Sequence, residues 1–269
     1  MVTASFFGLS MLFCLIGYFL GNILFGLIIS KIKKIDLRNV GSGNVGATNS
    51  LRAFGKIIGV SVMLFDMIKC WLSIFISVVL YHFIVPMFLS KDNSYLYEQN
   101  GFIIYLAGLF SVIGHCFPIF YIYALIKYKG DFNIAKKYSG GKGAASTAAL
   151  LFSISPWIFV TAFCIFFIVV LTTRYVSLSS IIAVSLSCFL TLIPHLDYLY
   201  ILNIPNLSII DSIPNVNQAY NVVNIINYQN NWWYILSIFL ILLFTSSIVV
   251  YRHKQNIIKL INKNESKIF

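Results

Sequence analysis

The sequence predicts an all-α fold, a polytopic bundle of transmembrane helices. Of the 269 residues, 59% are hydrophobic and 10% are charged, which is about half the charged fraction of an average soluble domain. Several apolar runs reach the roughly 20 residues that a helix needs to cross the hydrocarbon core of a bilayer. Most basic residues lie in three clusters beside these runs, a distribution typical of membrane orientation and phosphate handling and not of nucleic-acid binding.

Six apolar runs are expected to form helices, at about residues 6–29, 57–81, 101–126, 144–171, 177–194 and 232–251. The first run lacks the basic start and the cleavage site of a signal peptide, so we expect it to be retained as a helix. Basic residues gather in the loops after the first and third runs and in the C-terminal tail. The positive-inside rule places these three segments in the cytoplasm and the N-terminus outside.

This orientation requires the run at 144–171 to start and end on the cytoplasmic side. Ser155-Pro156 near its middle is expected to break the run, because proline lacks a backbone donor and clashes with the preceding turn. The result is a re-entrant or short helical pair, whose broken backbone must be satisfied by protein or by a water-filled cavity. The bundle then contains about seven helical segments, with this pair included.

The connection near 195–231 contains no Lys or Arg, so we expect it to be an external loop. The five cysteines stand singly and without CxxC spacing. Neither a disulfide framework nor a metal site is therefore expected.

A glycine-rich polar string, GSGNVGATNSLR, occupies residues 41–52 at the end of the first basic loop. Glycines let backbone amides converge, and the arginine adds a rigid fork of donors. These features suit a phosphate site, for which the candidate residues are Gly41, Ser42, Gly43, Asn44, Thr48, Asn49 and Arg52. A glycine-rich turn between two helices is the alternative, but it does not explain so many polar groups beside a bilayer.

A second string, GGKGAAST, begins at Gly140 and leads into an apolar run. The free amides and dipole at a helix start bind anions, and Lys142 adds a point charge. It is not a Walker A loop, because that pattern needs glycine at position 136, which is lysine here, and a hydroxyl residue in place of Gly143. Gly140, Gly141, Lys142 and Gly143 are candidate phosphate ligands, and a flexible basic loop is the alternative.

Polar groups also stand at the ends of other apolar runs. His115 ends the third run, and His253 and Asn256 follow the last one. Helix capping, an interfacial position or a positive-inside anchor are simpler explanations for such residues. Arg174 and Ser177 lie at the start of a further run, and the predicted topology puts them on the same side as the glycine-rich strings.

Asp66 and Lys69 lie inside the second run, three residues apart on one helical face. Either charge would be costly against lipid, so the two are expected to pair toward the protein interior, in a structural or a catalytic role. The polar strings together give the cytoplasmic face more anion-binding capacity than membrane anchoring requires. We therefore expect a phosphate-bearing, partly apolar substrate that enters from the bilayer.

These strings resemble the motifs of a known family, the bacterial membrane acyltransferases that use acyl phosphate to acylate glycerol 3-phosphate. GSGNVGATNSLR is similar to the first family motif, GHCFPIF and GGKGAAS to the second, and RHKQNIIKLINKNE to the third. The resemblance covers most of the chain. It implies that Ser42 and Arg52 are essential, that the glycines of the second motif serve the acyl phosphate, that His253 and Asn256 support activity, and that Glu265 holds structure.

The chain departs from the family pattern in places. An insertion near 122–138 separates the two parts of the second motif, within a single integral membrane domain expected over 1–269. Long surface insertions are tolerated thermodynamically, so the site need not be lost. Asn22 and Leu24 replace the usual Ser and Pro, and Lys259 and Lys263 replace Arg and Gly in the third motif.

The expected reaction is attack of the primary hydroxyl of glycerol 3-phosphate on the carbonyl carbon of acyl phosphate, giving lysophosphatidate and phosphate in the first step of phospholipid synthesis. Positioning and charge stabilisation can supply most of the rate, because the mixed anhydride is already activated. No cofactor, coenzyme A, metal or nucleic acid is expected. His253, His115 or a substrate phosphate could take the proton.

The expected location is the bacterial inner membrane, with the active site on the cytoplasmic side. A transporter or channel for a phosphorylated metabolite is the rival function. It would need ionisable residues at several depths of the membrane, and only Asp66 and Lys69 are candidates for this.

Overall fold

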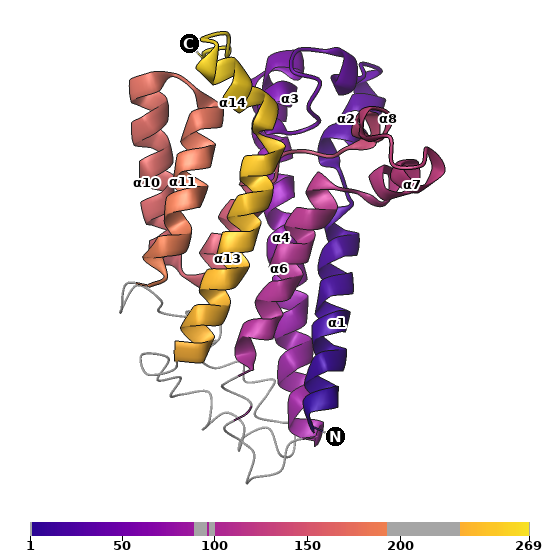
Figure 1. Ribbon diagram of the computed structural model, residues 1–269, viewed down its shortest axis with the longest axis vertical. Helices are drawn as coiled ribbons and strands as arrows, with labels where there is room; N and C mark the ends of the chain where they lie inside the picture. Colours follow the sequence, from indigo (N-terminus) through magenta and orange to yellow (C-terminus); the bar gives the residue numbers. More distant parts are fainter. Residues whose placement is uncertain (1, 89–95, 97–99, 193–231, 269) are drawn as a thin grey trace.

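The structure is a computed structural model that describes residues 2–88, 96, 100–192 and 232–268. Every regular element in these ranges is helical, which confirms the predicted fold class (Figure 1). The predicted external loop near 195–231 lies outside the described residues. The longer elements are α1 (Val2–Gly21), α2 (Phe25–Lys33), α3 (Ala47–Phe54), α4 (Lys56–Phe88), α6 (Tyr105–Cys116), α7 (Ile119–Lys127), α9 (Ala144–Ile154), α10 (Pro156–Thr173), α11 (Val176–Leu190), α13 (Trp232–Arg252) and α14 (Lys254–Ile261).

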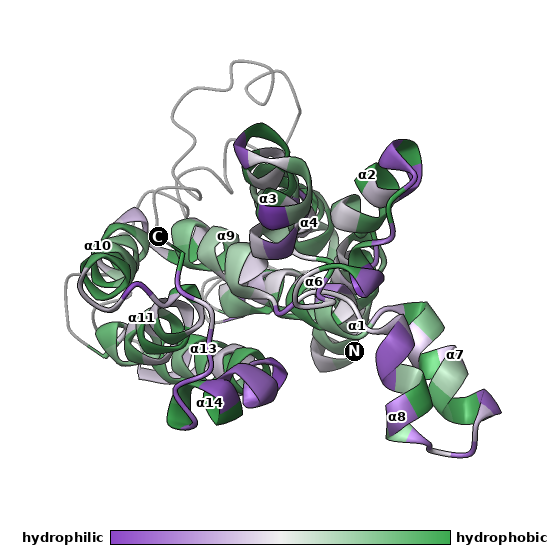
Figure 2. Ribbon diagram, turned by 90° about the horizontal axis from the view of Figure 1, so that it is seen from above, coloured by the Kyte–Doolittle hydropathy of each residue, from purple (hydrophilic) through white to green (hydrophobic). Residues whose placement is uncertain are grey.

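Four short helical elements of the described chain lie between these helices. They are η1 (Leu37–Asn39), η3 (Gly101–Ile104), α8 (Phe132–Ala135) and η4 (Lys136–Tyr138). The predicted insertion near 122–138 is thus folded as the end of α7 followed by α8 and η4. Figure 2 shows α7 and α8 standing out from the side of the bundle.

Seven apolar helices, α1, α4, α6, α9, α10, α11 and α13, form the bundle within the described residues. Their facing side chains share one apolar core, while large apolar side chains such as Phe7, Phe167 and Leu240 stay exposed on the outside. An apolar exterior is unfavourable in water and suits lipid. Among the described residues, four helical spans are long and apolar enough to cross a membrane, or five when the bent pair α6–α7 is taken as one span.

The predicted break at Ser155-Pro156 is present. Ser155 ends α9 and its hydroxyl accepts a hydrogen bond from the Ile158 amide at 3.5 Å, with Pro156 at the start of α10. The lengths differ from expectation: α9 has 11 residues, but α10 has 18 and is long enough to span. The run at 177–194, which was expected to cross the membrane, forms the shorter helix α11, with 15 residues. Hydropathy alone does not determine where a helix ends.

The third apolar run is also divided. Phe117 and Pro118 interrupt it, and α7 leaves the axis of the preceding helix by 56°. Proline cannot donate the backbone hydrogen bond that would continue the helix. The single helix expected over about 101–126 is therefore wrong: the run forms two helices, and the second directs the insertion away from the bundle.

Helices α1 and α6 pack closely against each other, and the contact depends on glycine. A Cβ atom at Gly17 would lie 2.0 Å from the Ala107 carbonyl oxygen, and one at Gly21 would lie 2.2 Å from that of Ser111. Small residues four apart let two membrane helices approach this closely. The contact fixes the end of α1 beside the end of α6, where polar groups gather.

We expect Gly17→Ile to destabilise the protein by about 2 kcal/mol or more, because added side-chain atoms would have to displace the α6 backbone. Thermal unfolding of the purified protein in detergent measures the effect. Gly8→Ile is the matched control on the same helix, since Gly8 has no atom within 4 Å of its Cβ position. Equal unfolding temperatures for the two variants would contradict the close contact.

Candidate active site

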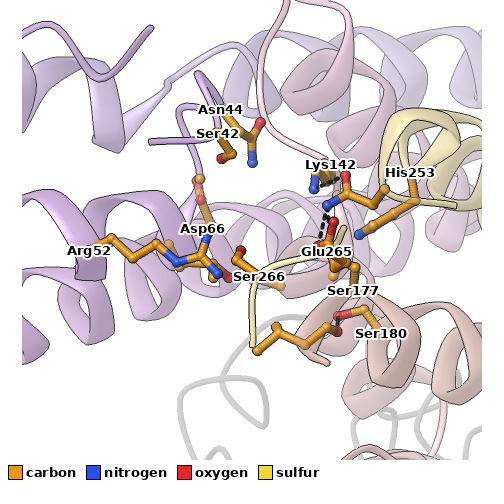
Figure 3. Close-up of a pocket in the computed structure, with 18 of the residues that line it drawn as sticks. Ser42, Asn44, Arg52, Asp66, Lys142, Ser177, Ser180, His253, Glu265 and Ser266 are labelled. Carbon is orange, nitrogen blue, oxygen red and sulfur yellow. Dashed lines mark hydrogen bonds between the residues drawn. The ribbon is translucent and has the colours of Figure 1, made fainter. Parts of the chain in front are cut away.

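A polar pocket of about 90 Å³ opens where the first loop, the segment at residues 140–143 and the C-terminal segment meet (Figure 3). It collects predicted site residues from every one of the polar strings: Ser42, Asn44, Thr48, Arg52, His115, Lys142, Gly143, Ser177, His253 and Asn256. Asp66 and Glu265 line it as well. We call this cavity the polar pocket.

Three helices of the described chain begin at the polar pocket. The first turns of α3 at Ala47, of α9 at Ala144 and of α11 at Val176 all line it, and none of these turns contains an acidic residue. The first amides of a helix have no partner within the helix and carry a partial positive charge. Three such ends directed at one small cavity favour an anion.

A chain of hydrogen bonds holds Lys142 in place at the wall of the polar pocket. Its ammonium donates to Asn256 Oδ1 at 2.6 Å, and Asn256 Nδ2 donates to Glu265 Oε1 at 2.6 Å and to Ser177 Oγ at 2.9 Å. The Ser177 hydroxyl donates to the same Glu265 oxygen at 2.8 Å. Glu265 therefore ties the C-terminal segment to α11, and Asn256 orients the ammonium.

The pKa of Lys142 is lowered to about 8, chiefly by burial; the neighbouring cations Arg252, Lys259 and Arg52 act in the same direction, and Glu265 opposes them. Lys142 therefore keeps its charge at neutral pH but is held among other positive groups. An arriving anion relieves that repulsion.

His253 is buried beside Lys142. Its Nδ1 lies 2.8 Å from the carbonyl oxygen of Val249, which can only accept, so Nδ1 carries the proton and Nε2 keeps its lone pair. Burial, and then the charge of Lys142, lower the pKa of His253 to about 4. The imidazole is neutral at neutral pH and is a weak base.

Asn49 supports the first loop from behind and does not line the polar pocket. Its side-chain oxygen accepts from the Ser42 amide at 3.0 Å, and its amide nitrogen donates to the carbonyls of Leu37 and Val40 at 3.0 and 2.9 Å. Gly41 and Gly43 adopt φ values of +58° and +67° in the same loop, a conformation that favours glycine. These residues place Ser42 at the polar pocket.

Gly140 and Gly141 form an irregular segment, the glycine segment, that packs against the end of α6. Their amides donate to the carbonyls of Cys116 and His115, both at 3.1 Å, so these two N–H groups are already paired. A Cβ at either glycine would collide with His115, at 1.8 Å from its carbonyl oxygen or 2.1 Å from its Nε2. Among the glycines of this string, Gly143 lines the polar pocket, whereas Gly140 and Gly141 provide close packing.

Arg252 binds the glycine segment through its carbonyl groups. Its guanidinium donates to the carbonyls of Gly140 and Gly141 at 2.9 and 3.2 Å and lies 5.4 Å above the ring of Phe117. A basic residue that served only as a positive-inside anchor at the end of α13 would not need these contacts. The guanidinium therefore joins the C-terminal segment to the glycine segment.

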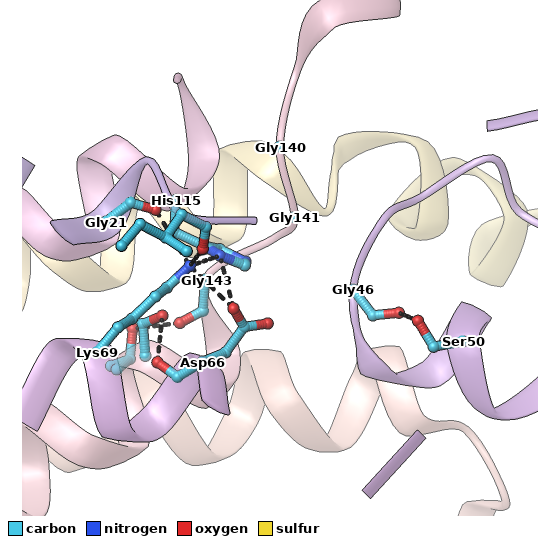
Figure 4. Close-up of polar contacts among 12 residues, drawn as sticks. Gly21, Gly46, Ser50, Asp66, Lys69, His115, Gly140, Gly141 and Gly143 are labelled. Atoms are coloured by element: carbon cyan, nitrogen blue, oxygen red, sulfur yellow. Dashed lines mark hydrogen bonds and ion pairs between the residues drawn. The ribbon is translucent and has the colours of Figure 1, made fainter. Parts of the chain in front are cut away.

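Asp66, Lys69 and His115 form a buried cluster beneath the polar pocket (Figure 4). The Lys69 ammonium lies 2.9 Å from Asp66 Oδ1 and 2.8 Å from His115 Nδ1. It also donates to the carbonyls of Gly21 and Ile23 at 3.1 and 2.7 Å, where α1 ends. The pair thus faces the interior, and Asp66 and His115 both reach the polar pocket.

Arg174 does not line the polar pocket. It ends α10 with a φ of 65°, and its carbonyl accepts from the Ile268 amide at 3.0 Å. The candidate site residues predicted from the sequence did not include Gly46, Ala47, Ala144, Ala145, Val176, Ser180 and Ser266, which do line it. Ser180 could have been included, because it lies three residues after Ser177 on the same face of a helix.

An apolar cavity of about 200 Å³ adjoins the polar pocket. The two share Ala47, Thr48, Ala144, Ala145, Val176 and Ser180, and the apolar cavity then runs between α4, α9, α10 and α11. Its outer part is lined by methionine and phenylalanine side chains, including Met63, Met67, Phe159, Phe163 and Phe166. A ligand with an anionic head and a hydrocarbon tail fits this combination of surfaces.

Residues 11–263 match the family model described as glycerol-3-phosphate acyltransferase. A glycerol-3-phosphate acyltransferase of Malacoplasma penetrans is 48% identical over 262 residues, which cover 97% of this chain and 95% of the relative. Another, of Mycoplasma pneumoniae, is 34% identical over 270 residues, which cover 100% and 98%.

The fold matches a solved structure of the same type. A crystal structure of PlsY, an integral membrane glycerol 3-phosphate acyltransferase in its glycerol 3-phosphate form, superposes with a TM-score of 0.63 at 28% identity. The match covers 97% of this chain and 96% of that one. A second structure, of the lysophosphatidic acid form, matches with a TM-score of 0.61 at 26% identity.

Raising the pH through about 8 is expected to weaken phosphate binding roughly 3- to 10-fold, because Lys142 loses its proton there. Calorimetric titration with inorganic phosphate between pH 7 and pH 9 measures the decline. Lys142→Arg should remove it, since a guanidinium stays charged throughout. Lys137→Arg, an exposed residue outside the polar pocket, is the control and should keep it; a decline that persists in Lys142→Arg would contradict this origin.

Proposed function

This chain belongs to the glycerol-3-phosphate acyltransferase family, and we propose that it transfers a fatty acyl group from acyl phosphate to the primary hydroxyl of sn-glycerol 3-phosphate. The products are lysophosphatidate and inorganic phosphate. The observation that carries this proposal is the junction of the polar pocket with the apolar cavity. An acyl phosphate has one phosphate and one hydrocarbon chain, and each finds a matching surface at that junction.

Two phosphate groups must be held near each other for this reaction. Their mutual repulsion is offset by the helix N-termini at Ala47, Ala144 and Val176 together with the charges of Arg52 and Lys142. Preorganised positive groups of this kind also stabilise the negative charge that develops on the carbonyl oxygen of the acyl group. Neither nucleotide nor coenzyme A is required for the activation, because the anhydride bond supplies it.

The proposed chemistry is a direct transfer. The hydroxyl oxygen of glycerol 3-phosphate forms a bond to the acyl carbon, the bond from that carbon to the phosphate oxygen breaks, and inorganic phosphate leaves. His115 has its Nδ1 against Lys69, and the pKa of His253 is lowered to about 4. Both are poor general bases in this setting, so we assign the hydroxyl proton to a phosphate oxygen of the donor. Ser42, Asn256 and Lys142 position the reacting groups.

The proposed site of this reaction is the cytoplasmic face of the bacterial inner membrane. Lys31, Lys33 and Lys34 close α2, and Lys254 and Lys259 lie in α14, at the end of the bundle where the polar pocket opens (Figure 1). The positive-inside rule favours the cytoplasm for that end. Acyl phosphate would then enter from the bilayer and glycerol 3-phosphate from water.

Purified protein is expected to form lysophosphatidate from palmitoyl phosphate and glycerol 3-phosphate, and none from palmitoyl-coenzyme A. Mass spectrometry of the lipid extract measures the product. Arg52→Gln should lower kcat/KM by about 100-fold, since a charge-assisted phosphate contact is worth a few kcal/mol. Turnover of the coenzyme A thioester would contradict the donor, and uptake of unchanged glycerol 3-phosphate into vesicles would favour a transporter.

Ala183→Leu is expected to shift the acyl preference toward shorter chains, because the leucine side chain would occupy part of the apolar cavity. Each displaced methylene forfeits about 0.8 kcal/mol, so kcat/KM for a 16-carbon donor should fall roughly tenfold relative to a 10-carbon donor. Ala4→Leu introduces the same side chain at an exposed position on α1 and is the control. An unchanged chain-length profile in Ala183→Leu would contradict the assignment of the apolar cavity to the acyl chain.

A further inference from the structure

A second polar cavity, of about 390 Å³, lies on the outer side of the polar pocket. It shares Ser42, Asn44, Lys142 and Asn256 with the polar pocket, so the two are continuous. The rest of its wall comes from α14 on one side and from the α7–α8–η4 insertion on the other. We call this cavity the outer chamber.

The insertion wall is a folded unit with its own support. Tyr121, Ala124 and Ala135 pack into a small apolar cluster with Phe117. Asp131 caps α8 by accepting from the amides of Asn133 and Ile134 at 2.8 and 3.2 Å. These contacts hold Phe132, Asn133 and Lys136 toward α14, and this is the segment in which the chain departs from its family resemblance.

The outer chamber is lined by cations and, among the described residues, by no carboxylate. Lys136 comes from the insertion, Lys254 and Lys259 come from α14, and Lys142 and Arg252 lie at the inner end. The described part of the chain gives Lys136, Lys254 and Lys259 no ion pair with an acidic side chain. Converging unpaired cations in a recessed, polar cavity attract anions and raise their local concentration.

The arrangement separates two routes to the polar pocket. The apolar cavity meets it through Ala47, Ala144 and Val176, whereas the outer chamber meets it through Ser42, Asn44 and Lys142. A hydrocarbon chain fits the first opening. A small, water-soluble dianion fits the second, because the outer chamber is larger than the polar pocket and its lysines Lys136, Lys254 and Lys259 are exposed to solvent.

We propose that the outer chamber is a second phosphate site, in which Lys136 of the insertion and Lys254 and Lys259 of α14 receive the dianion of glycerol 3-phosphate before it moves to the polar pocket. This inference rests on the proposed function for the identity of the ligand. The recognised group is a phosphate dianion, which inorganic phosphate and the lysophosphatidate headgroup also carry. The insertion thus adds a binding surface for the water-soluble reactant.

The test uses full-length protein with Lys136→Gln, Lys254→Gln and the double substitution. Each single change is expected to raise the KM for glycerol 3-phosphate about 3-fold, and the double change about 10-fold, as the loss of partly screened charges predicts. The kcat and the KM for acyl phosphate should stay within about 2-fold, because the polar pocket and the apolar cavity are untouched. The salt dependence of kcat/KM should also become shallower.

Lys127→Gln/Lys129→Gln is the matched control, since it removes two charges from the same insertion outside the lining of the outer chamber. It should leave all these constants unchanged. Inhibition by inorganic phosphate and by lysophosphatidate in mixed micelles separates the possible sources of the dianion. A change confined to one inhibitor would support the site and assign it to that product, whereas no change in KM or in either inhibition constant would overturn it.

A phosphate titration keeps this test independent of turnover. The wild-type protein is expected to show at least one more binding event with inorganic phosphate than Lys136→Gln/Lys254→Gln does, because the double variant loses the outer chamber. Absence of acyl transfer together with this difference in phosphate binding would contradict the proposed function alone. The same number of binding events with the same affinities in wild type and double variant would contradict the outer chamber alone.

Discussion

The buried ammonium of Lys69 is the interaction on which the polar end of the bundle depends. A charge inside a membrane helix must be surrounded by acceptors, and Lys69 finds Asp66 on its own helix, the carbonyls of Gly21 and Ile23 where α1 ends, and His115 at the end of α6. Three helices are thereby held at one level. The glycine contact between α1 and α6 brings these ends close enough for the cluster to form.

Backbone hydrogen bonds connect this cluster to the polar pocket. The carbonyl of His115 accepts from the Gly141 amide, and the carbonyl of Gly141 accepts from Arg252 at the end of α13. The glycine segment, held between His115 and Arg252, places Lys142 and the start of α9 at the polar pocket. These hydrogen bonds connect the buried Lys69 cluster to Lys142, although the two lysines do not touch each other.

The broken helix at Ser155 has a related consequence. It allows α9 to remain short, so that its N-terminus opens on the same cavity as those of α3 and α11. A continuous helix over the whole run could not place α10 and α11 as the outer wall of the apolar cavity. The polar pocket therefore lies between an apolar cavity on one side and the cationic outer chamber on the other, and each presents a surface for a chemically different reactant.

The sequence by itself determined the fold class, the break at Ser155-Pro156 and the strings that supply the polar pocket. These follow from local properties, because hydropathy is a sum over neighbouring residues and proline acts on its own turn. Only the tertiary structure decided that Gly140 and Gly141 pack against His115 while Gly143 faces the cavity, that Asn49 supports Ser42 from behind, and that the insertion meets α14. Those outcomes depend on distances between segments far apart in the chain, which residue spacing does not contain.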